Sequence, residues 1–220
     1  MIIEKNLPFL PLWLRADTFR PVRGWLAGTD AYLLYSLARR GPSTGCIVEI
    51  GSAWGRSTVF LAAGSKVAGR EVVFAIDPHT GDQWFLEGVA PPRGGSPNGP
   101  KSELDSQFTS LTEFMRNIRR FRLADWVKPV VSTASMAAET LETGPIRLLY
   151  IDGLHTYEGV KEDIRNWVPR LAPGGAVVFD DYFNSRPDVG VSRAVDELLL
   201  SGLVRSKLQR ARNLAWTIRE

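Results

Sequence analysis

Cysteine and histidine are scarce in this sequence. Its 220 residues include one cysteine, Cys46, and two histidines, His79 and His155. A single cysteine cannot form an internal disulfide, and zinc sites of the usual thiolate composition need several cysteines. Cys46 stands at the head of an apolar run, so we expect it to be a small buried hydrophobic residue.

Long apolar runs are also missing. No stretch approaches the roughly 18 residues that a membrane-spanning helix needs. The N-terminal stretch MIIEKNLPFLPLWLRAD is apolar but short, is interrupted by prolines and lacks a small-residue cleavage site after it, which disfavours a signal peptide. We predict a cytoplasmic protein.

The sequence has no large excess of charge of one sign. The formal net charge is +3, and charged residues of both signs make up 23% of the chain, which indicates a globular protein. A chain of this length can bury one sizeable core but not two. We therefore predict a single domain over residues 1–220, with residues 1–21 as an N-terminal extension.

The densest basic cluster consists of four arginines, which we assign to the solvated face of a helix. Apolar residues at helical spacing supply the opposite face. The arginines do not interleave with aromatic residues, so a nucleic-acid partner is disfavoured despite a pI of about 9.2. The arginines are Arg116, Arg119, Arg120 and Arg122, and the apolar residues are Leu111, Phe114, Ile118 and Phe121.

Short apolar runs rich in β-formers alternate with helical patterns along the chain. This order predicts an α/β fold with a doubly wound parallel sheet that helices cover on both faces. The expected strands are 46–50, 72–76, 127–131, 146–151 and 176–180, followed by a C-terminal pair whose last member is 213–218. The expected helices are 29–40, one starting near 57, 109–122, 157–171 and 192–200.

Residues 81–107 form a long stretch rich in glycine and proline. A loop of this length inside a compact domain is usually a lid, a binding loop or disordered. We predict a lid over the ligand, and plain disorder is the alternative.

Acidic residues follow several expected strands: Glu49, Asp77, Asp152 and Asp180 all stand at or near a strand end. Ligands of such sheets bind beyond the carboxyl ends of the strands. The acids therefore indicate a ligand site at this edge.

The segment VEIGSAWGRS joins a strand to a helix through a glycine turn. Glycines let the backbone approach a ligand, and a helix N-terminus offers unpaired N–H groups. The spacing is G-x-x-x-G rather than G-x-G-x-x-G, which argues against a nicotinamide cofactor. Asp77, after the next strand, would accept hydrogen bonds from two ribose hydroxyls. Alternatively, Gly51 and Gly55 only shape a tight turn and Asp77 caps a helix.

VEIGSAWGRSTVFLA resembles motif I of class I S-adenosylmethionine-dependent methyltransferases. AIDPHTGD, SLTEFMRNIRRFRLADWVKPVVSTAS and YIDGLHTYEGVKEDIRNWVPRLAPGGAVVFDDY resemble, in the same order, the branch of O-methyltransferases that tailor sugars and polysaccharides, which is related to the metal-dependent catechol enzymes. The resemblance covers roughly residues 22–195. It implies a Rossmann-like methyltransferase sheet, mostly parallel with an antiparallel C-terminal strand.

The resemblance also implies a role for each residue of an S-adenosylmethionine site. Glu49 would lie beside the methionyl amino group, and Asp77 would hold the ribose. Ser135 would border the adenine between Ala134 and Met136, although it could be an ordinary helix cap. The residues expected beside the methionyl carboxylate are Gly51, Ser52, Gly55 and Ser57.

A second group of residues points to a metal ion. Asp152, Asp180 and Asp181 would meet at adjacent strand ends, where like charges need a cation, and oxygen ligands suit Mg²⁺. The resemblance agrees, because the metal-dependent O-methyltransferases have an Asp at the first position and Asp followed by Asp or Asn at the other two. The alternative is that Asp180 and Asp181 merely begin a turn.

His155 replaces the catalytic lysine of the catechol enzymes, and an imidazole is a suitable general base for a hydroxyl that a metal acidifies. It could instead position substrate or cap the next helix. His79 is expected to be structural or associated with the lid.

Together these features predict an S-adenosylmethionine- and Mg²⁺-dependent O-methyltransferase that acts on a small molecule, a sugar or glycan being favoured. The alternatives are a catechol-type or nucleic-acid methyltransferase, a non-catalytic cofactor-binding protein and a hydroxylase-like relative. The sequence leaves homo-oligomerisation open.

Overall fold

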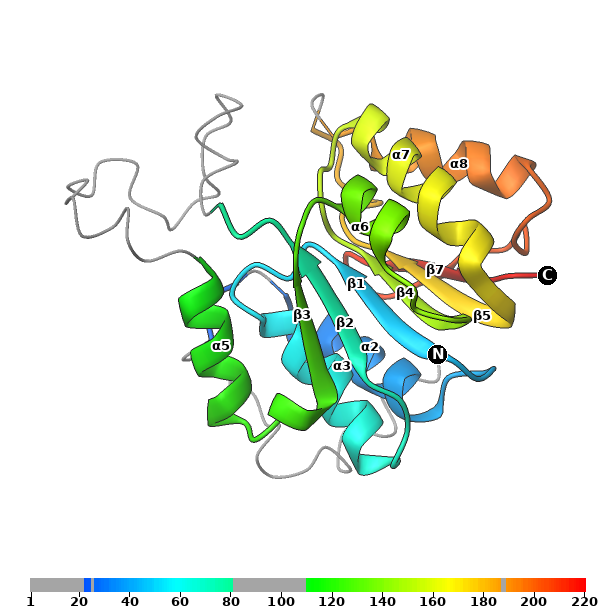
Figure 1. Cartoon of the computed structure of the whole chain (residues 1–220). Helices are drawn as coiled ribbons and strands as arrows, with labels where there is room; N and C mark the ends of the chain where they lie inside the picture. Colours follow the sequence, from blue (N-terminus) through cyan, green and yellow to red (C-terminus); the bar gives the residue numbers. More distant parts are fainter. Residues whose placement is uncertain (1–21, 25, 81–109, 187–188) are drawn as a thin grey trace, which may run out of the picture.

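The computed structural model describes residues 22–24, 26–80, 110–186 and 189–220. The predicted N-terminal extension, residues 1–21, and the predicted lid, residues 81–107, lie outside the described residues. The sheet and the helices described below lie within these ranges (Figure 1).

A seven-stranded sheet forms the centre of the molecule, in the order β3-β2-β1-β4-β5-β7-β6. The parallel strands are β1 (Cys46–Ile50), β2 (Val73–Asp77), β3 (Val127–Val131), β4 (Ile146–Ile151) and β5 (Leu171–Phe179). The antiparallel strands are β6 (Gln209–Arg210) and β7 (Ala215–Ile218). This arrangement confirms the predicted α/β, doubly wound, Rossmann-like sheet with an antiparallel C-terminal strand.

Helices cover both faces of the sheet, as Figure 1 shows. One hydrophobic cluster joins the sheet to α2 (Gly28–Arg40), α3 (Arg56–Val67) and α5 (Ser110–Arg120). A second cluster joins the other face to α6 (Ala134–Thr140), α7 (Tyr157–Trp167) and α8 (Val191–Leu200). The central strands β1 and β4 are buried along their whole length, as expected for a sheet with two covered faces.

Two predicted boundaries differ from the structure by four residues or more. The helix expected to reach residue 171 ends at Trp167, and the 3₁₀ turn η5 (Val168–Arg170) follows. Pro169 explains this end because proline has no N–H for the next helical bond. Strand β5 starts at Leu171, before the Pro173-Gly174-Gly175 segment that we expected to precede it. Its pairing with β4 shifts register after Ile146, so the strand accommodates this segment as an irregularity.

The predicted solvated face of the arginine helix is confirmed. Phe114 and Ile118 are buried in α5, and Arg116, Arg119 and Arg120 are exposed. Cys46 is buried as predicted, and this burial raises the pKa of its thiol to about 11. None of the described helices is long and apolar enough to cross a membrane.

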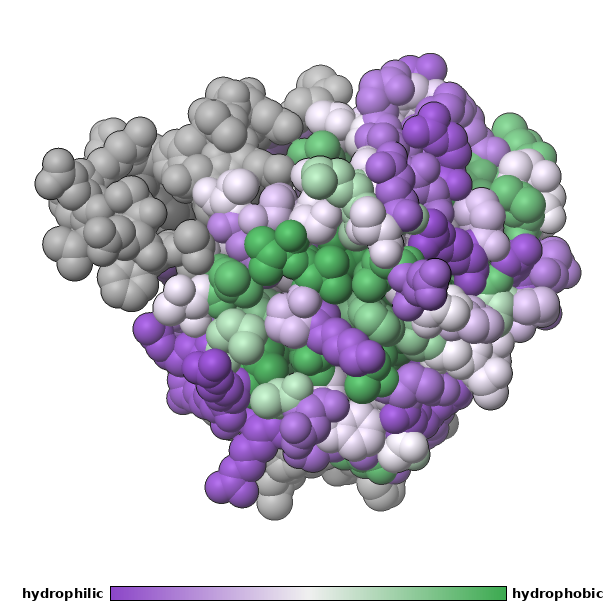
Figure 2. Space-filling view, in the orientation of Figure 1, coloured by the Kyte–Doolittle hydropathy of each residue, from purple (hydrophilic) through white to green (hydrophobic). Residues whose placement is uncertain are grey.

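Apolar residues gather in the centre of the surface drawn in Figure 2, over β2, β3 and α6. Helix α6 has only seven residues and covers this part of the sheet incompletely. Val131, at the end of β3, is 57% exposed, and Met136 in α6 is 61% exposed. Val131 precedes Ser135 in the sequence and Met136 follows it, so both exposed residues lie near the start of α6, where the adenine was predicted to bind.

Candidate active site

The carboxyl edge of the sheet collects the predicted acids. Strands β2, β1, β4 and β5 are neighbours in that order. One of the acids lies near the end of each strand or directly after it. Glu49 lies in β1, Asp77 ends β2, Asp152 follows β4 and Asp180 follows β5. The structure thus brings together the two groups of residues that the sequence suggested separately.

The turn between β1 and α3 requires its glycines. Gly51 has a φ of 86°, and a Cβ there would lie 2.0 Å from the carbonyl oxygen of Asp152. Gly55, the residue before α3, has a φ of 85°, and a Cβ would lie 3.0 Å from the ring of Phe114. Only glycine adopts this backbone conformation at little cost. The glycines thus let the turn pack closely against Asp152 and Phe114, and no side chain among the described residues caps the start of α3.

Glu49 is a fully buried carboxylate beneath this turn. Its Oε2 accepts a hydrogen bond from the Thr58 hydroxyl, whereas Oε1 accepts none from the part of the chain that the structure describes. Burial raises the pKa of Glu49 to about 8, against the lowering effect of the nearby Ser57 and Thr58 hydroxyls. Ser52 is also buried, and its hydroxyl likewise has no partner among the described residues. Such unpaired groups are costly unless a ligand completes them.

Asp77 is held by backbone N–H groups on both sides. Its Oδ2 accepts from the N–H of Ala53 at 2.8 Å, and its Oδ1 accepts from the N–H of His79 at 2.6 Å. Ala53 and His79 have φ values of 42° and 52°, which non-glycine residues rarely adopt. This strained backbone fixes the carboxylate, and its remaining lone pairs can accept from vicinal hydroxyls.

His79 is 2% exposed and packs beside Asp77, and its expected role, structural or associated with the lid, stays a prediction. Its Nδ1 lies 3.0 Å from the Ser110 hydroxyl, and its ring packs against Phe114 at 5.3 Å between centroids. Burial lowers the pKa of His79, so the neutral imidazole is favoured.

Ser135 lies half-buried in the first turn of α6. The helix cap is Thr133, whose hydroxyl accepts from the N–H of Met136 at 3.2 Å. The alternative that Ser135 caps this helix is therefore wrong.

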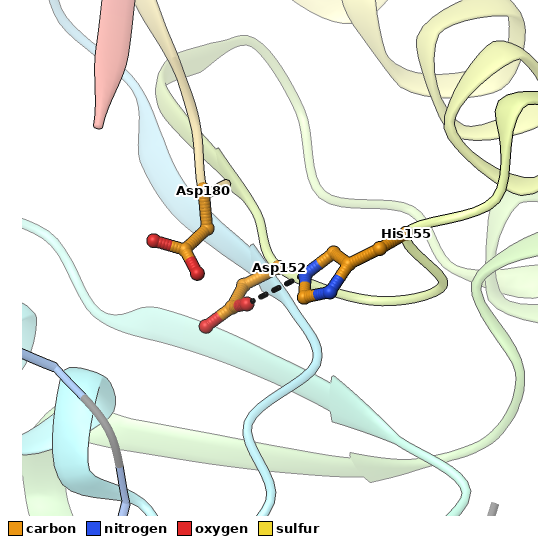
Figure 3. Close-up of side chains that lie close together, drawn as sticks. All are labelled: Asp152, His155 and Asp180. Carbon is orange, nitrogen blue, oxygen red and sulfur yellow. Dashed lines mark hydrogen bonds and ion pairs between the residues drawn. The ribbon is translucent and has the colours of Figure 1, made fainter. Parts of the chain in front are cut away.

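The acids after β4 and β5 form a cluster with His155. One ligand atom each from Asp152, His155 and Asp180 lies within 4.8 Å of the others, a spacing that suits a metal ion (Figure 3). Nε2 of His155 is 3.2 Å from Oδ1 of Asp152, as the dashed line in Figure 3 marks. The three side chains converge from the ends of two adjacent strands.

Asp181 stands beside this cluster rather than within it. Its Oδ2 is 3.6 Å from Nδ1 of His155 and accepts a hydrogen bond from the Asn184 amide at 3.0 Å. His155 thus lies between two carboxylates. The structure places His155, and not Asp181, with Asp152 and Asp180.

Negative charge is concentrated at this cluster. Burial raises the pKa of Asp180, and the charges of Asp152 and Asp181 raise it further. Burial would lower the pKa of His155, but its hydrogen bond to Asp152 and the charges of Asp152 and Asp181 outweigh that effect and raise it. Burial is the largest cause for Asp180, and the closeness of several carboxylates contributes to both shifts.

Tyr150 supports the cluster and was not singled out from the sequence. Its fully buried hydroxyl donates to Oδ2 of Asp152 at 2.9 Å. Within the apolar run IRLLYI it looks like an ordinary core residue. Thr58, which donates to Glu49, was missed for a similar reason, since its role depends on a contact between α3 and β1.

A protein-family model described as a methyltransferase domain matches residues 48–182. Among curated proteins, the uncharacterized protein y4gI of Sinorhizobium fredii is 41% identical over 49 residues, which are 22% of this chain. The chain spans only 5% of the length of that relative.

Solved structures of methyltransferases share the fold. The O-methyltransferase NovP aligns with a TM-score of 0.62 and 21% identity, over 86% of this chain and 78% of NovP. The methyltransferase PaMTH1 of Podospora anserina, in a structure bound to S-adenosylhomocysteine (SAH), aligns with a TM-score of 0.67 and 15% identity, over 96% of this chain and 88% of PaMTH1. Because the family model spans more than half of the chain and contains both the glycine turn and the Asp152 cluster, the protein belongs to the methyltransferase-domain family.

Proposed function

We propose that the protein is an S-adenosylmethionine-dependent O-methyltransferase that uses a divalent cation, Mg²⁺ being the first choice, to methylate a hydroxyl of a small molecule. One observation carries the proposal: a glycine turn with unpaired buried polar groups and an Asp-His-Asp cluster share one edge of the sheet. The first fits the cofactor, and the second fits acceptor chemistry. The O-methyltransferase NovP and SAH-bound PaMTH1 have the same fold and support this assignment.

The residues present fit the cofactor. Oε1 of Glu49 lacks a donor among the described residues, and the methionyl ammonium group would supply one. Asp77 would accept from the two ribose hydroxyls. Ser135 would border the adenine beside the exposed apolar side chain of Met136. The residues proposed to contact the methionyl carboxylate are Gly51, Ser52, Gly55 and Ser57.

The oxygen-rich cluster fits a hard cation. Asp152, Asp180 and Asp181 are the proposed ligands, and the geometry also allows His155 to replace Asp181. A sulfonium methyl donor and a divalent cation, when bound, would supply the methyl group and lower the pKa of the acceptor hydroxyl.

The chain's own contribution is orientation and proton removal. Asp77 and Glu49 would fix the cofactor so that its methyl group faces the cluster. A nitrogen of His155 would accept the proton of the acceptor hydroxyl, and the resulting imidazolium would be stabilised by Asp152 and Asp181. Two neighbouring hydroxyls suit a chelating cation, so a vicinal diol is the proposed acceptor, with a sugar or glycan preferred to a catechol.

Turnover with S-adenosylmethionine on a panel of sugars and catechols, with and without Mg²⁺, tests the function. We expect methylated product from a vicinal diol and its loss after chelation with EDTA. Calorimetric titration with SAH gives a separate test of the cofactor site. Binding of SAH without methylation of any diol would support the proposed cofactor site and contradict the proposed acceptor chemistry.

A further inference from the structure

The turn between β6 and β7 reaches the same edge of the sheet as the Asp152 cluster. Because β7 runs antiparallel to β5, its first residue, Ala215, pairs with Phe179, which directly precedes Asp180. On the other side, Ala215 pairs with Arg210, the last residue of β6. Two strand spacings, or about 10 Å, therefore separate the backbones of Arg210 and Phe179. Arg210 lies at the acceptor end of the site and on the side away from the glycine turn.

A buried carboxylate fixes this turn in place. Asp30 of α2 is 1% exposed, and its two carboxylate oxygens accept from the N–H of Asn213 at 3.3 and 3.4 Å. Ala211 and Leu214 are buried in the hydrophobic cluster on that face and share a backbone hydrogen bond of 2.9 Å. The strand end that carries Arg210 is consequently a rigid support.

The guanidinium of Arg210 lies over the ring of Phe183, 3.9 Å from its centroid. Phe183 follows the Asp180-Asp181 pair by two residues and is itself packed edge-on against Tyr182 at 4.8 Å between centroids. An arginine stacked on an aromatic ring keeps its N–H donors in the plane, where they can bind a planar anion in bidentate fashion. Stacking on Phe183 thus orients the guanidinium group and leaves its N–H donors available for a ligand.

Those donors have no acidic partner within the ranges that the structure describes. The ion pairs found there use other arginines, such as Arg147 with Glu71 and Arg193 with Glu197, and none includes Arg210. Arg210 is exposed, and it brings a positive charge beside a cluster of carboxylates that by itself would repel an anionic acceptor.

We propose that Arg210, held flat on Phe183, binds an anionic group of the acceptor, a carboxylate or a phosphate. The acceptor class is then a hydroxylated acid, such as a sugar acid or sugar phosphate, rather than a neutral diol. The anion binds at Arg210, and the acidic cluster repels it, so the acceptor is oriented with its hydroxyls toward Asp152 and Asp180. This inference rests on the proposed function, because it assigns a substrate class to the same site.

Matched acceptors test the subsite directly. Binding is measured by calorimetry on protein saturated with SAH and Mg²⁺, for catechol against 3,4-dihydroxybenzoate and for glucose against glucuronate and glucose 6-phosphate. We expect the anionic member to bind more tightly in at least one pair. Arg210→Met should then weaken binding of that member by about 10- to 150-fold, the range for a hydrogen bond to a charged group, and leave the neutral member unchanged. Comparing glucuronate with glucose 6-phosphate separates carboxylate from phosphate.

Arg210→Lys keeps the charge but loses the planar fork, so it should restore only part of the preference. Arg165→Met, which removes an exposed arginine from α7, is the matched control and should leave the preference intact. Equal binding of neutral and anionic members by the wild type, or equal losses for both in Arg210→Met, would overturn the proposal. Turnover is measured separately: a preference that depends on Arg210, without methylated product, would support the subsite and contradict the proposed function.

Discussion

Asp77 and Asp180 both follow a buried parallel strand at the same edge of the sheet, yet their surroundings differ. Asp77 accepts from two backbone N–H groups, those of Ala53 and His79. Asp180 instead faces Asp152 and His155, and burial and neighbouring carboxylates raise its pKa. The protein itself satisfies the first carboxylate. The second belongs to the cluster for which a cation is proposed, and this difference separates the proposed cofactor end from the proposed acceptor end.

The difference between the two carboxylates predicts that metal removal affects the acceptor end and not the cofactor end. This is the largest effect expected. EDTA, or Asp152→Ala or Asp180→Ala, should abolish turnover, because each removes the cation or one of its ligands. Binding of SAH, measured by calorimetry, should stay nearly unchanged. Asp125→Ala, an exposed acid in the 3₁₀ turn η4 (Ala124–Trp126), is the control and should leave turnover intact. Full activity in EDTA would reject the metal and leave His155 to act alone.

Loss of His155 should be the next largest effect. If it is the base, His155→Ala lowers the rate by roughly 10²–10⁴-fold, the usual contribution of a positioned base, and high pH restores part of it. Metal content, measured on the same variant, decides between the two roles of the histidine. Retained metal supports a base, whereas loss of metal along with activity would assign His155 as a ligand.

At the cofactor end, Asp77→Ala should weaken SAH binding by about 1–3 kcal/mol, the range for a hydrogen-bonding partner left unpaired. The metal affinity should not change, because the hydrogen bonds and ion pair described for Asp77 are with Ala53 and His79 and not with the Asp152 cluster. Calorimetric titrations of SAH and of Mg²⁺ measure both. Unchanged SAH affinity would contradict the assignment of Asp77 to the ribose site.

Tyr150→Phe offers a smaller change at the acceptor end. It removes the hydroxyl that donates to Asp152 and keeps the buried ring. Groups that orient metal ligands typically contribute 10- to 100-fold in affinity or activity. The Mg²⁺ concentration for half-maximal turnover should therefore rise by about that factor, whereas thermal stability stays close to the wild type. An unchanged Mg²⁺ requirement would show that Asp152 does not depend on Tyr150.

The sequence allowed the sheet to be predicted well, because its central strands are continuous apolar runs. Residues 46–50 and 146–151 match the central strands β1 and β4, and residues 127–131 match the edge strand β3, whose run is less apolar. The start of β5 was missed because Pro173-Gly174-Gly175 indicated a turn, and only pairing with β4 carries the strand through it. The acids at strand ends could be predicted from position alone.

The partners of those acids could not be predicted, because they depend on contacts across elements. Thr58 reaches Glu49 from α3, and Tyr150 in β4 reaches Asp152 in the loop that follows, but the sequence presents both only as buried residues in apolar surroundings. The pairing of His155 with both Asp152 and Asp181 depends on how the loop after β4 meets the turn after β5. Local sequence does not specify that approach.

The smallest predicted effect concerns a proton at Glu49. Burial raises the pKa of this carboxyl to about 8, so at pH 7 the free protein holds it mostly protonated. An ammonium group beside Oε1 favours the ionised carboxylate. Binding of SAH at pH 7 should therefore release up to one proton per site. Calorimetry in buffers with different ionisation enthalpies measures this number. Release should shrink as the pH rises through 8, because the free carboxyl is then already ionised, and Glu49→Gln should abolish the contribution of this site. The same proton release in Glu49→Gln as in the wild type would place the cofactor's amino group elsewhere.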